Sequence, residues 1–115
     1  MKRLRTGVLG CGVISRVYLK NLTTRYADRV EVVAAGDIVA ELAQKSCEEF
    51  KIPRACSPDE LLADKSIELV LNLTPAPVHY GLNKQILQAD KHLYSEKPLA
   101  LTMDQARDLV NMAKE

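Results

Sequence analysis

Three small residues, Gly10, Gly12 and Ser15, have the spacing of a turn that brings a phosphate against the main chain. They lie between the apolar run 7–9 and a segment with helical periodicity, so the turn joins a strand to a helix. Glycine allows a sharp turn and a close approach by a ligand, and the following helix directs its first N–H groups at that ligand. Serine replaces the usual third glycine or alanine with only a small increase in size. Alone, this pattern is equally compatible with a purely structural turn.

An acidic residue, Asp37, ends the second apolar segment, about 20 residues after Ser15. The dinucleotide fingerprint has a carboxylate at that separation, where it binds the ribose hydroxyls of the adenosine half. The alternative is that Asp37 caps a helix beginning at Ile38, and the two roles can coexist. A 2′-phosphate about 4 Å away would be repelled by roughly 4 kcal/mol per charge pair at an effective dielectric constant of 20. Because no basic residue adjoins Asp37, the sequence favours NAD over NADP.

A lysine, Lys97, lies between Glu96 and Pro98 directly after the last apolar segment. The three residues form either a solvated loop or a stiffened lysine site beside the expected nicotinamide. An ammonium group there can position a substrate hydroxyl or assist its proton transfer. His79, expected in the first turn of a helix, is open to three interpretations: a helix cap, a cofactor contact or a surface residue.

Short apolar segments that alternate with helical patterns must position these residues. The predicted strands are 4–9, 31–35, 54–56 (a brief edge strand), 69–73 and 91–95. Alternating strands and helices predict a doubly wound parallel α/β sheet of the Rossmann type, as a single domain with strand order 3-2-1-4-5. Ligands bind such sheets at the carboxyl ends of the strands, where the order reverses. The polar or Gly/Pro-containing segments at those ends are 10–14, Asp37, 74–77 and 96–98.

The helices are predicted from apolar stripes at spacings of three and four residues. The expected stripes are Val13, Ile14, Val17, Tyr18 and Leu22; Val39, Leu42, Ala43, Cys47 and Phe50; Val78, Leu82, Ile86 and Ala89; and Met103, Ala106, Val110 and Ala113. A further short helix is predicted after Ser57, which forms a capping box with Glu60 and is followed by Pro58. Thr102 is expected to cap the last helix.

Composition excludes several other classes of protein. The 115 residues suffice for one domain with its own core, and a net charge of +1 gives no general attraction to nucleic acid or to a membrane. The sequence contains no apolar run of about 20 residues that would span a bilayer. Three widely spaced cysteines have no metal-ligand spacing and fit a reduced, cytoplasmic protein. Cys11, between two glycines, is expected to act through its backbone and not through its thiol.

Three blocks of the sequence together resemble the Gfo/Idh/MocA family of oxidoreductases. They are residues 7–15, then Thr74-Pro75 with His79, and then residues 91–100, which read KHLYSEKPLA. The last block is more specific than the glycine turn, which many Rossmann domains share. The resemblance spans the chain and implies a nicotinamide-dependent dehydrogenase acting on a sugar, a cyclitol or a related polyol.

The resemblance also implies roles for particular residues. The pyrophosphate site would be formed by Gly10, Gly12, Val13 and Ile14, the adenosine ribose site by Asp37, and the cofactor cleft by Leu73, Thr74, Pro75 and His79. Glu96 and Lys97 would lie near the nicotinamide ribose and the substrate, with Lys97 as the catalytic or substrate-positioning lysine. The family often has a cis peptide bond at this Lys-Pro pair, which is therefore expected at Lys97-Pro98.

The chain departs from the family pattern in its length. Members continue into a second α/β domain that supplies most substrate contacts, so residues 1–115 are expected to be the cofactor domain and to show no turnover alone. The sequence is compatible with a homo-oligomer, because an exposed strand edge would let copies pair. The alternative functions are a non-catalytic nucleotide-binding or sensor module and, less favoured, a methyltransferase that gives the later motifs no role.

Overall fold

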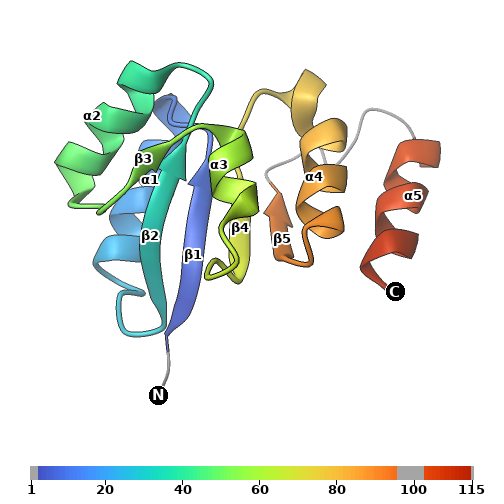
Figure 1. The fold of residues 1–115 in the computed structure, drawn as a ribbon, viewed down its shortest axis with the longest axis horizontal. Helices are drawn as coiled ribbons and strands as arrows, with labels where there is room; N and C mark the ends of the chain where they lie inside the picture. The colour runs from blue at the N-terminus through green and yellow to red at the C-terminus, as the bar shows by residue number, and fades with distance from the viewer. Residues whose placement is uncertain (1–2, 96–102, 115) are drawn as a thin grey trace.

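A five-stranded parallel sheet forms the centre of the molecule. The computed structural model describes residues 3–95 and 103–114 (Figure 1). The strands are β1 (Leu4–Leu9), β2 (Val30–Gly36), β3 (Ala55–Cys56), β4 (Leu69–Asn72) and β5 (His92–Ser95). Their order is β3-β2-β1-β4-β5, which confirms the predicted topology and the short edge strand. The order reverses next to β1, so a ligand is expected at the carboxyl end of that strand.

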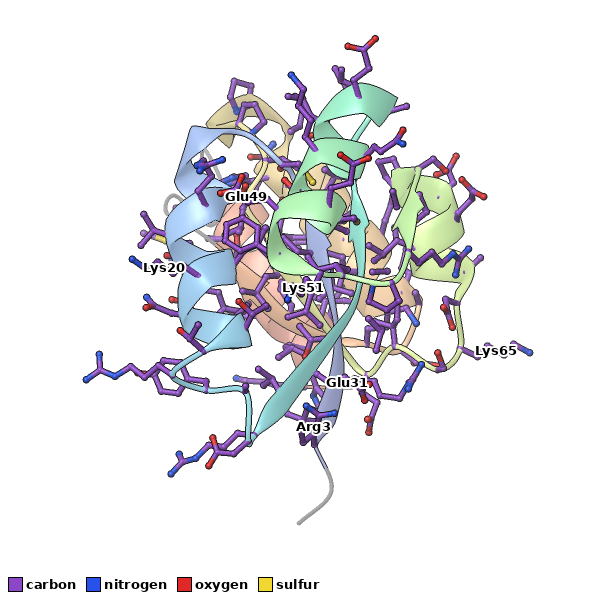
Figure 2. The ribbon with its side chains drawn as sticks, turned by 90° about the vertical axis from the view of Figure 1, so that its left-hand side faces the viewer. Arg3, Lys20, Glu31, Glu49, Lys51 and Lys65 are labelled. Carbon is purple, nitrogen blue, oxygen red and sulfur yellow. The ribbon has the colours of Figure 1, made fainter. Side chains whose placement is uncertain are left out.

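Helices cover both faces of the sheet. They are α1 (Val13–Thr23), α2 (Ala40–Phe50), α3 (Pro58–Ala63), α4 (His79–Gln88) and α5 (Met103–Ala113), with a 3₁₀ turn, η1 (Ala76–Val78), before α4. Figure 2, which views the sheet from its β3 edge, shows α1 and α2 on one side and α3 on the other. In Figure 1, α5 lies beside α4, at the far end of the molecule from α2.

Alternate residues of the strands form two separate cores. One core combines Val8 and Leu71 with Leu19 of α1 and Cys47 of α2. The other is built from the strand residues that point the opposite way, packed against Leu61 of α3 and Ile86 of α4. The strands β1, β2 and β4 are thus buried on both faces over most of their length, which explains why their sequences are mainly apolar instead of alternating.

The predicted apolar stripes of α1 and α5 are partly wrong. Val17 is 64% exposed, whereas Leu19 is fully buried and faces the sheet. In α5 the buried residue is Leu109, while Met103 and Val110 are exposed. Both helices contain two overlapping stripes of apolar residues. Which stripe packs depends on the rotation of the helix against its neighbours, which periodicity alone does not determine.

The start of α3 follows the prediction. The Ser57 hydroxyl accepts a hydrogen bond from the Glu60 N–H at 3.2 Å, and the Glu60 carboxylate accepts one from the Ser57 N–H at 3.0 Å. This reciprocal pair is the predicted capping box, with Pro58 at the first helical position. By contrast, α2 begins at Ala40 and not at Ile38, with Val39 as its N-cap residue. The alternative interpretation, that Asp37 is the N-cap residue of a helix starting at Ile38, is therefore wrong.

Candidate nucleotide-binding cleft

A cleft of about 930 Å³ opens at the carboxyl ends of β1, β2 and β4. Its walls come from the glycine turn, the segment after β2, and the segment from the end of β4 into α4. Seven of the predicted site residues line it: Gly10, Gly12, Asp37, Leu73, Thr74, Pro75 and His79. Residues far apart in the chain thus meet at the point where the strand order reverses.

Gly10 is required at its position by both backbone conformation and space. Its φ angle is +94°, in the region that residues with side chains rarely adopt. A Cβ at this position would lie 2.8 Å from the carbonyl carbon of Leu73 and from the Thr74 nitrogen. The turn is therefore packed directly against the chain that leaves β4, and any side chain there would force the two apart.

Gly12 differs, because nothing in the protein occupies the space beside it. A Cβ added to Gly12 would meet no atom within 4 Å. Gly12 is the N-cap residue of α1 and provides no side-chain cap, so the first N–H groups of the helix lack that partner. An open approach to the start of a helix is the arrangement that suits a phosphate. At the third fingerprint position, Ser15 is fully buried and donates its hydroxyl hydrogen to the Gly12 carbonyl at 2.6 Å.

The Asp37 carboxylate connects the end of β2 to the glycine turn. Its Oδ2 atom accepts a hydrogen bond from the Cys11 N–H at 2.8 Å, and its Oδ1 atom accepts one from the Val39 N–H at 2.8 Å. The second bond satisfies the backbone just before α2, which is a capping role displaced from the predicted one. The first holds the carboxylate beside the turn, with the side chain only partly buried.

Apolar side chains from two elements face the cleft on either side. Ile38, Val39 and Leu42 come from the segment after β2 and the start of α2, and Val78 and Leu82 come from η1 and α4. Ile38 is 89% exposed, and Val39 and Leu42 are also exposed. The prediction that Val39 and Leu42 pack in the core is wrong, because they belong to a wall of the cleft. Such a slot suits a flat aromatic ring.

His79 is a buried residue and not a surface one. Its side chain is 1% exposed, and its Nε2 atom is hydrogen-bonded to the Thr74 carbonyl oxygen. This contact ties the first residue of α4 to the loop that follows β4. Among the three interpretations left open by the sequence, exposure at the surface is excluded, and His79 both braces the loop and lines the cleft.

The Cys11 thiol is not suited to act as a nucleophile. Burial raises the pKa of its thiol to about 11, and the Sγ atom donates to the Gly36 carbonyl at 3.7 Å. The main-chain N–H of Cys11 is the group that serves the cleft, through Asp37. Within residues 3–95 and 103–114, no group of three or more His, Cys, Asp or Glu residues could hold a metal ion.

Some predicted residues lie wholly or partly outside the described structure. Glu96, Lys97 and the Lys97-Pro98 peptide bond fall within residues 96–102, as does the Thr102 cap, and all lie outside the described ranges. Val13 and Ile14 form the first turn of α1 through their backbone, and their side chains are not described. Two buried residues beside the cleft, Asn72 and Asn83, were not predicted: Asn72 is a single polar residue in an apolar run, and Asn83 lies next to Lys84 and Gln85 in a segment that reads as the polar side of a helix.

The fold and the cleft define a dinucleotide-binding domain. Residues 4–115 match the family model of the oxidoreductase family with an NAD-binding Rossmann fold, Gfo/Idh/MocA. The chain belongs to this family and is an NAD(P)-binding Rossmann domain of an oxidoreductase. The resemblance inferred from residues 7–15, 74–79 and 91–100 is therefore confirmed.

The curated relatives include dehydrogenases named for inositol and for UDP-N-acetylglucosamine. The chain is 32% identical over 110 residues to an inositol 2-dehydrogenase/D-chiro-inositol 3-dehydrogenase of Lacticaseibacillus casei, which covers 94% of this chain and 32% of the relative. It is 31% identical over 115 residues to a UDP-N-acetylglucosamine 3-dehydrogenase of Acidithiobacillus ferrooxidans, covering all of this chain and 35% of the relative. The chain thus spans about a third of the length of these relatives.

Solved structures with the same fold carry either form of the cofactor. GenD2 from gentamicin A biosynthesis, in complex with NAD, superposes with a TM-score of 0.89 at 27% identity, over 99% of this chain and 32% of that one. KijD10, a 3-ketoreductase from Actinomadura kijaniata in complex with NADP, superposes with a TM-score of 0.91 at 28% identity, over 98% of this chain and 34% of that one. None of the helices described here is long and apolar enough to cross a membrane.

Proposed function

We propose that the chain binds NAD and is the cofactor domain of an oxidoreductase that transfers a hydride between NAD and a sugar, a cyclitol or a related polyol. The observation that carries the proposal is the Asp37 carboxylate, held by the Cys11 N–H at the edge of a glycine turn. A carboxylate and an open helix start, side by side, match a ribose followed by a pyrophosphate.

The lining of the cleft fits the parts of a dinucleotide in order. The pyrophosphate would lie over residues 10–14, where Gly12 leaves open space at the start of α1. The adenosine ribose would bond Asp37, and the adenine ring would lie against the apolar residues that follow it, Ile38, Val39 and Leu42. The nicotinamide half would then extend past β1 toward the segment 73–79 and, by the family resemblance, toward Glu96 and Lys97.

The charge of the cleft favours NAD over NADP. Among its described lining residues are two carboxylates, Asp37 and Asp59, and no lysine or arginine. A 2′-phosphate next to Asp37 would meet a like charge without a compensating cation, at a cost of roughly 4 kcal/mol per charge pair at about 4 Å. The exposed residue after Asp37 is Ile38, which donates no hydrogen bond from its side chain.

The reaction assigned to the full-length protein rests on the relatives and on Lys97. Bound NAD supplies a hydride acceptor, and the Lys97 ammonium or amine would hold the substrate hydroxyl and take part in its proton transfer. The relatives named as inositol and UDP-N-acetylglucosamine dehydrogenases support a polyol or sugar substrate. Substrate contacts would come mainly from the two thirds of the relatives' length that this chain does not span. The three buried cysteines, none in a disulfide, fit a reducing compartment such as the cytoplasm.

Calorimetric titration with NAD and NADP tests the cofactor assignment. We expect NAD to bind the chain at least about tenfold more tightly than NADP, because the two ligands differ only by the phosphate facing Asp37. Asp37→Asn keeps the shape of the side chain and should reduce this preference, since it removes the like charge. Asp37→Ala should weaken NAD binding as well. Absence of heat with millimolar NAD would refute cofactor binding by this chain.

A further inference from the structure

Two asparagines lie buried where the protein would otherwise be apolar. Asn72 is the last residue of β4, and Asn83 is one turn into α4; both are fully buried. Neither is among the residues that line the cleft. An asparagine amide carries two donors and an acceptor with two lone pairs, so burying it is costly unless its partners are supplied.

The Asn72 side chain bonds in two directions. Its Oδ1 atom accepts from the Thr74 N–H at 3.2 Å and from the Thr74 hydroxyl at 2.5 Å. Its Nδ2 atom donates to Asn83 Oδ1 at 2.8 Å and to the His79 carbonyl at 3.5 Å. A single side chain therefore holds the loop that lines the cleft and, on its other side, the helix that follows that loop.

Asn83 continues the connection to the neighbouring strand. Its Nδ2 atom donates to the Ser95 hydroxyl at 3.1 Å. Ser95 is the last residue of β5, and it immediately precedes the segment that contains Glu96 and Lys97. The side chains of Asn72, Asn83 and Ser95 thus link the ends of β4 and β5 through α4. We call them the amide bridge.

Stability alone does not require this arrangement. A strand and a helix pack equally well through two aliphatic side chains, and replacing both partners of a buried hydrogen bond by apolar groups of the same shape is nearly neutral. Apolar packing does not fix the orientation of the loop, because dispersion contacts do not depend on which of its atoms faces the neighbouring side chain. The amide bridge specifies the position of both the N–H and the hydroxyl of Thr74.

We propose that Asn72 and Asn83 are positioning residues for the nicotinamide half of the bound cofactor. The inference rests on the proposed function, since it concerns the same cleft. In the sheet, β2 lies on one side of β1 and β4 on the other, so Asp37 and Thr74 flank the glycine turn on opposite sides. The adenosine half would meet Asp37, and Thr74, which the amide bridge holds, lies on the side of the half beyond the pyrophosphate.

The positioning role predicts different effects on the affinities for two ligands, NAD and AMP. Removing the amide bridge should weaken binding of NAD, which reaches the Thr74 loop, and should leave binding of AMP, which does not, unchanged. General destabilisation of the fold would not distinguish the two ligands, because both would be bound by the same fraction of folded protein. The comparison of NAD with AMP therefore isolates positioning from folding.

The experiment titrates the chain and its variants with NAD and with AMP. For Asn72→Leu we expect about tenfold weaker binding of NAD, because two hydrogen bonds to the loop are lost, and less than about twofold change for AMP. Ser95→Ala removes the far end of the bridge and keeps the bonds from Asn72 to Thr74, so about threefold weaker NAD binding and unchanged AMP binding are expected. Ser95 is partly exposed, so this variant still decides the question if Asn72→Leu does not fold.

Lys91→Met is the matched control. Lys91 is 6% exposed, and its Nζ atom donates to the carbonyl oxygens of Asp64 at 2.6 Å and Ile67 at 3.0 Å, at the opposite end of the sheet. The substitution also removes a buried polar link, so it should lower the unfolding midpoint and leave the binding of both ligands unchanged.

The outcomes separate the two proposals. If the unmodified chain binds neither ligand, the proposed function fails. If it binds both, and Ser95→Ala and every folded Asn72 variant retain the NAD affinity of the unmodified chain, the cofactor assignment stands and the positioning role is wrong. Parallel loss of NAD and AMP affinity would likewise refute positioning, because it would indicate a change in the fold as a whole.

Discussion

At the scale of single residues, the site depends more on the main chain than on reactive side chains. Gly10 allows a close approach to the chain leaving β4, Gly12 leaves open space, and Cys11 contributes its N–H to Asp37. The Cys11 thiol is buried on the other side of the turn. This division between a functional backbone and an inert side chain can be tested directly.

We predict that iodoacetamide at pH 8 does not modify Cys11 in the folded chain. A thiol with a pKa of about 11 is ionised in roughly one molecule per thousand at that pH, and burial restricts access further. The pKa values of Cys47 and Cys56 are also raised by burial, so they should behave similarly. Mass spectrometry after labelling gives the readout, with the chain unfolded in urea, where all three should react, as the control.

A matched substitution completes this test. Cys11→Ala keeps the N–H that bonds Asp37, so its affinity for NAD should stay within about twofold of the unmodified chain. Rapid labelling of native Cys11, or a loss of affinity comparable to that of Asp37→Ala, would show that the thiol itself contributes to the site.

At the scale of secondary-structure elements, the helices differ in whether their starts are capped by nearby side chains. The start of α3 is encoded locally, because Ser57, Pro58 and Glu60 supply the cap without help from the rest of the chain. The starts of α1 and α4 have no side-chain cap and face the cleft. A helix whose start binds no phosphate can be capped by its own side chains, whereas a phosphate-binding helix needs its first N–H groups accessible.

We expect Ser57→Ala to lower the free energy of unfolding by about 1 kcal/mol, as measured by urea denaturation. Glu60 adds a pH dependence to the same cap. Hydrogen bonds from the Ser57 N–H and hydroxyl lower the pKa of the Glu60 carboxyl below its usual 4.5 in the folded chain. Its contribution to stability is therefore present above that value and lost as the pH falls through the folded-state pKa.

Glu60→Gln is the control for this pH dependence. The variant should show a smaller loss of stability than the unmodified chain between about pH 5 and pH 3, because its side chain does not titrate. Binding of NAD at neutral pH should be unaffected by either substitution, since neither residue lines the cleft. Identical pH profiles for Glu60→Gln and the unmodified chain would contradict the assigned role of the carboxylate.

At the scale of the whole molecule, cofactor binding and catalysis are expected to separate. The described residues contain five strands in the order β3-β2-β1-β4-β5 around the cleft, and the chain spans about a third of its curated relatives. Under the proposed function, the adenosine and pyrophosphate groups would bind mainly at the ends of β1 and β2. Under the proposed function, most contacts that orient a polyol for hydride transfer would come from the part of the relatives' length that this chain does not span.

We therefore predict that the chain binds NAD without catalysing its reduction when mixed with myo-inositol or UDP-N-acetylglucosamine. Absorbance at the wavelength of the reduced cofactor provides the assay. In a full-length protein carrying this chain, Lys97→Ala should lower kcat by about a hundredfold or more, because a positioned proton-transfer group is lost. Unchanged activity after that substitution would favour a non-catalytic nucleotide-binding or sensor module.

Much of the architecture could be predicted from sequence. The strand order, the edge position of β3 and the capping box follow from local patterns, and the meeting of Gly10, Asp37 and Thr74 follows from the rule for parallel sheets. The faces of α1 and α5 were mispredicted, since Leu19 and Leu109 compete with neighbouring apolar residues for the buried side. Periodicity identifies a helix, but its rotation depends on the surfaces that it meets.

The sequence by itself determined the class of fold and the family, and it predicts where phosphate and ribose would bind, because all of these depend on residue types at short, regular spacings. Only the tertiary structure decided that His79 is buried against Thr74 and that Val39 and Leu42 belong to a wall of the cleft. It also decided that Asn72 meets Asn83. A buried hydrogen bond depends on the relative placement of two groups from different elements, and that placement is set when the elements pack together.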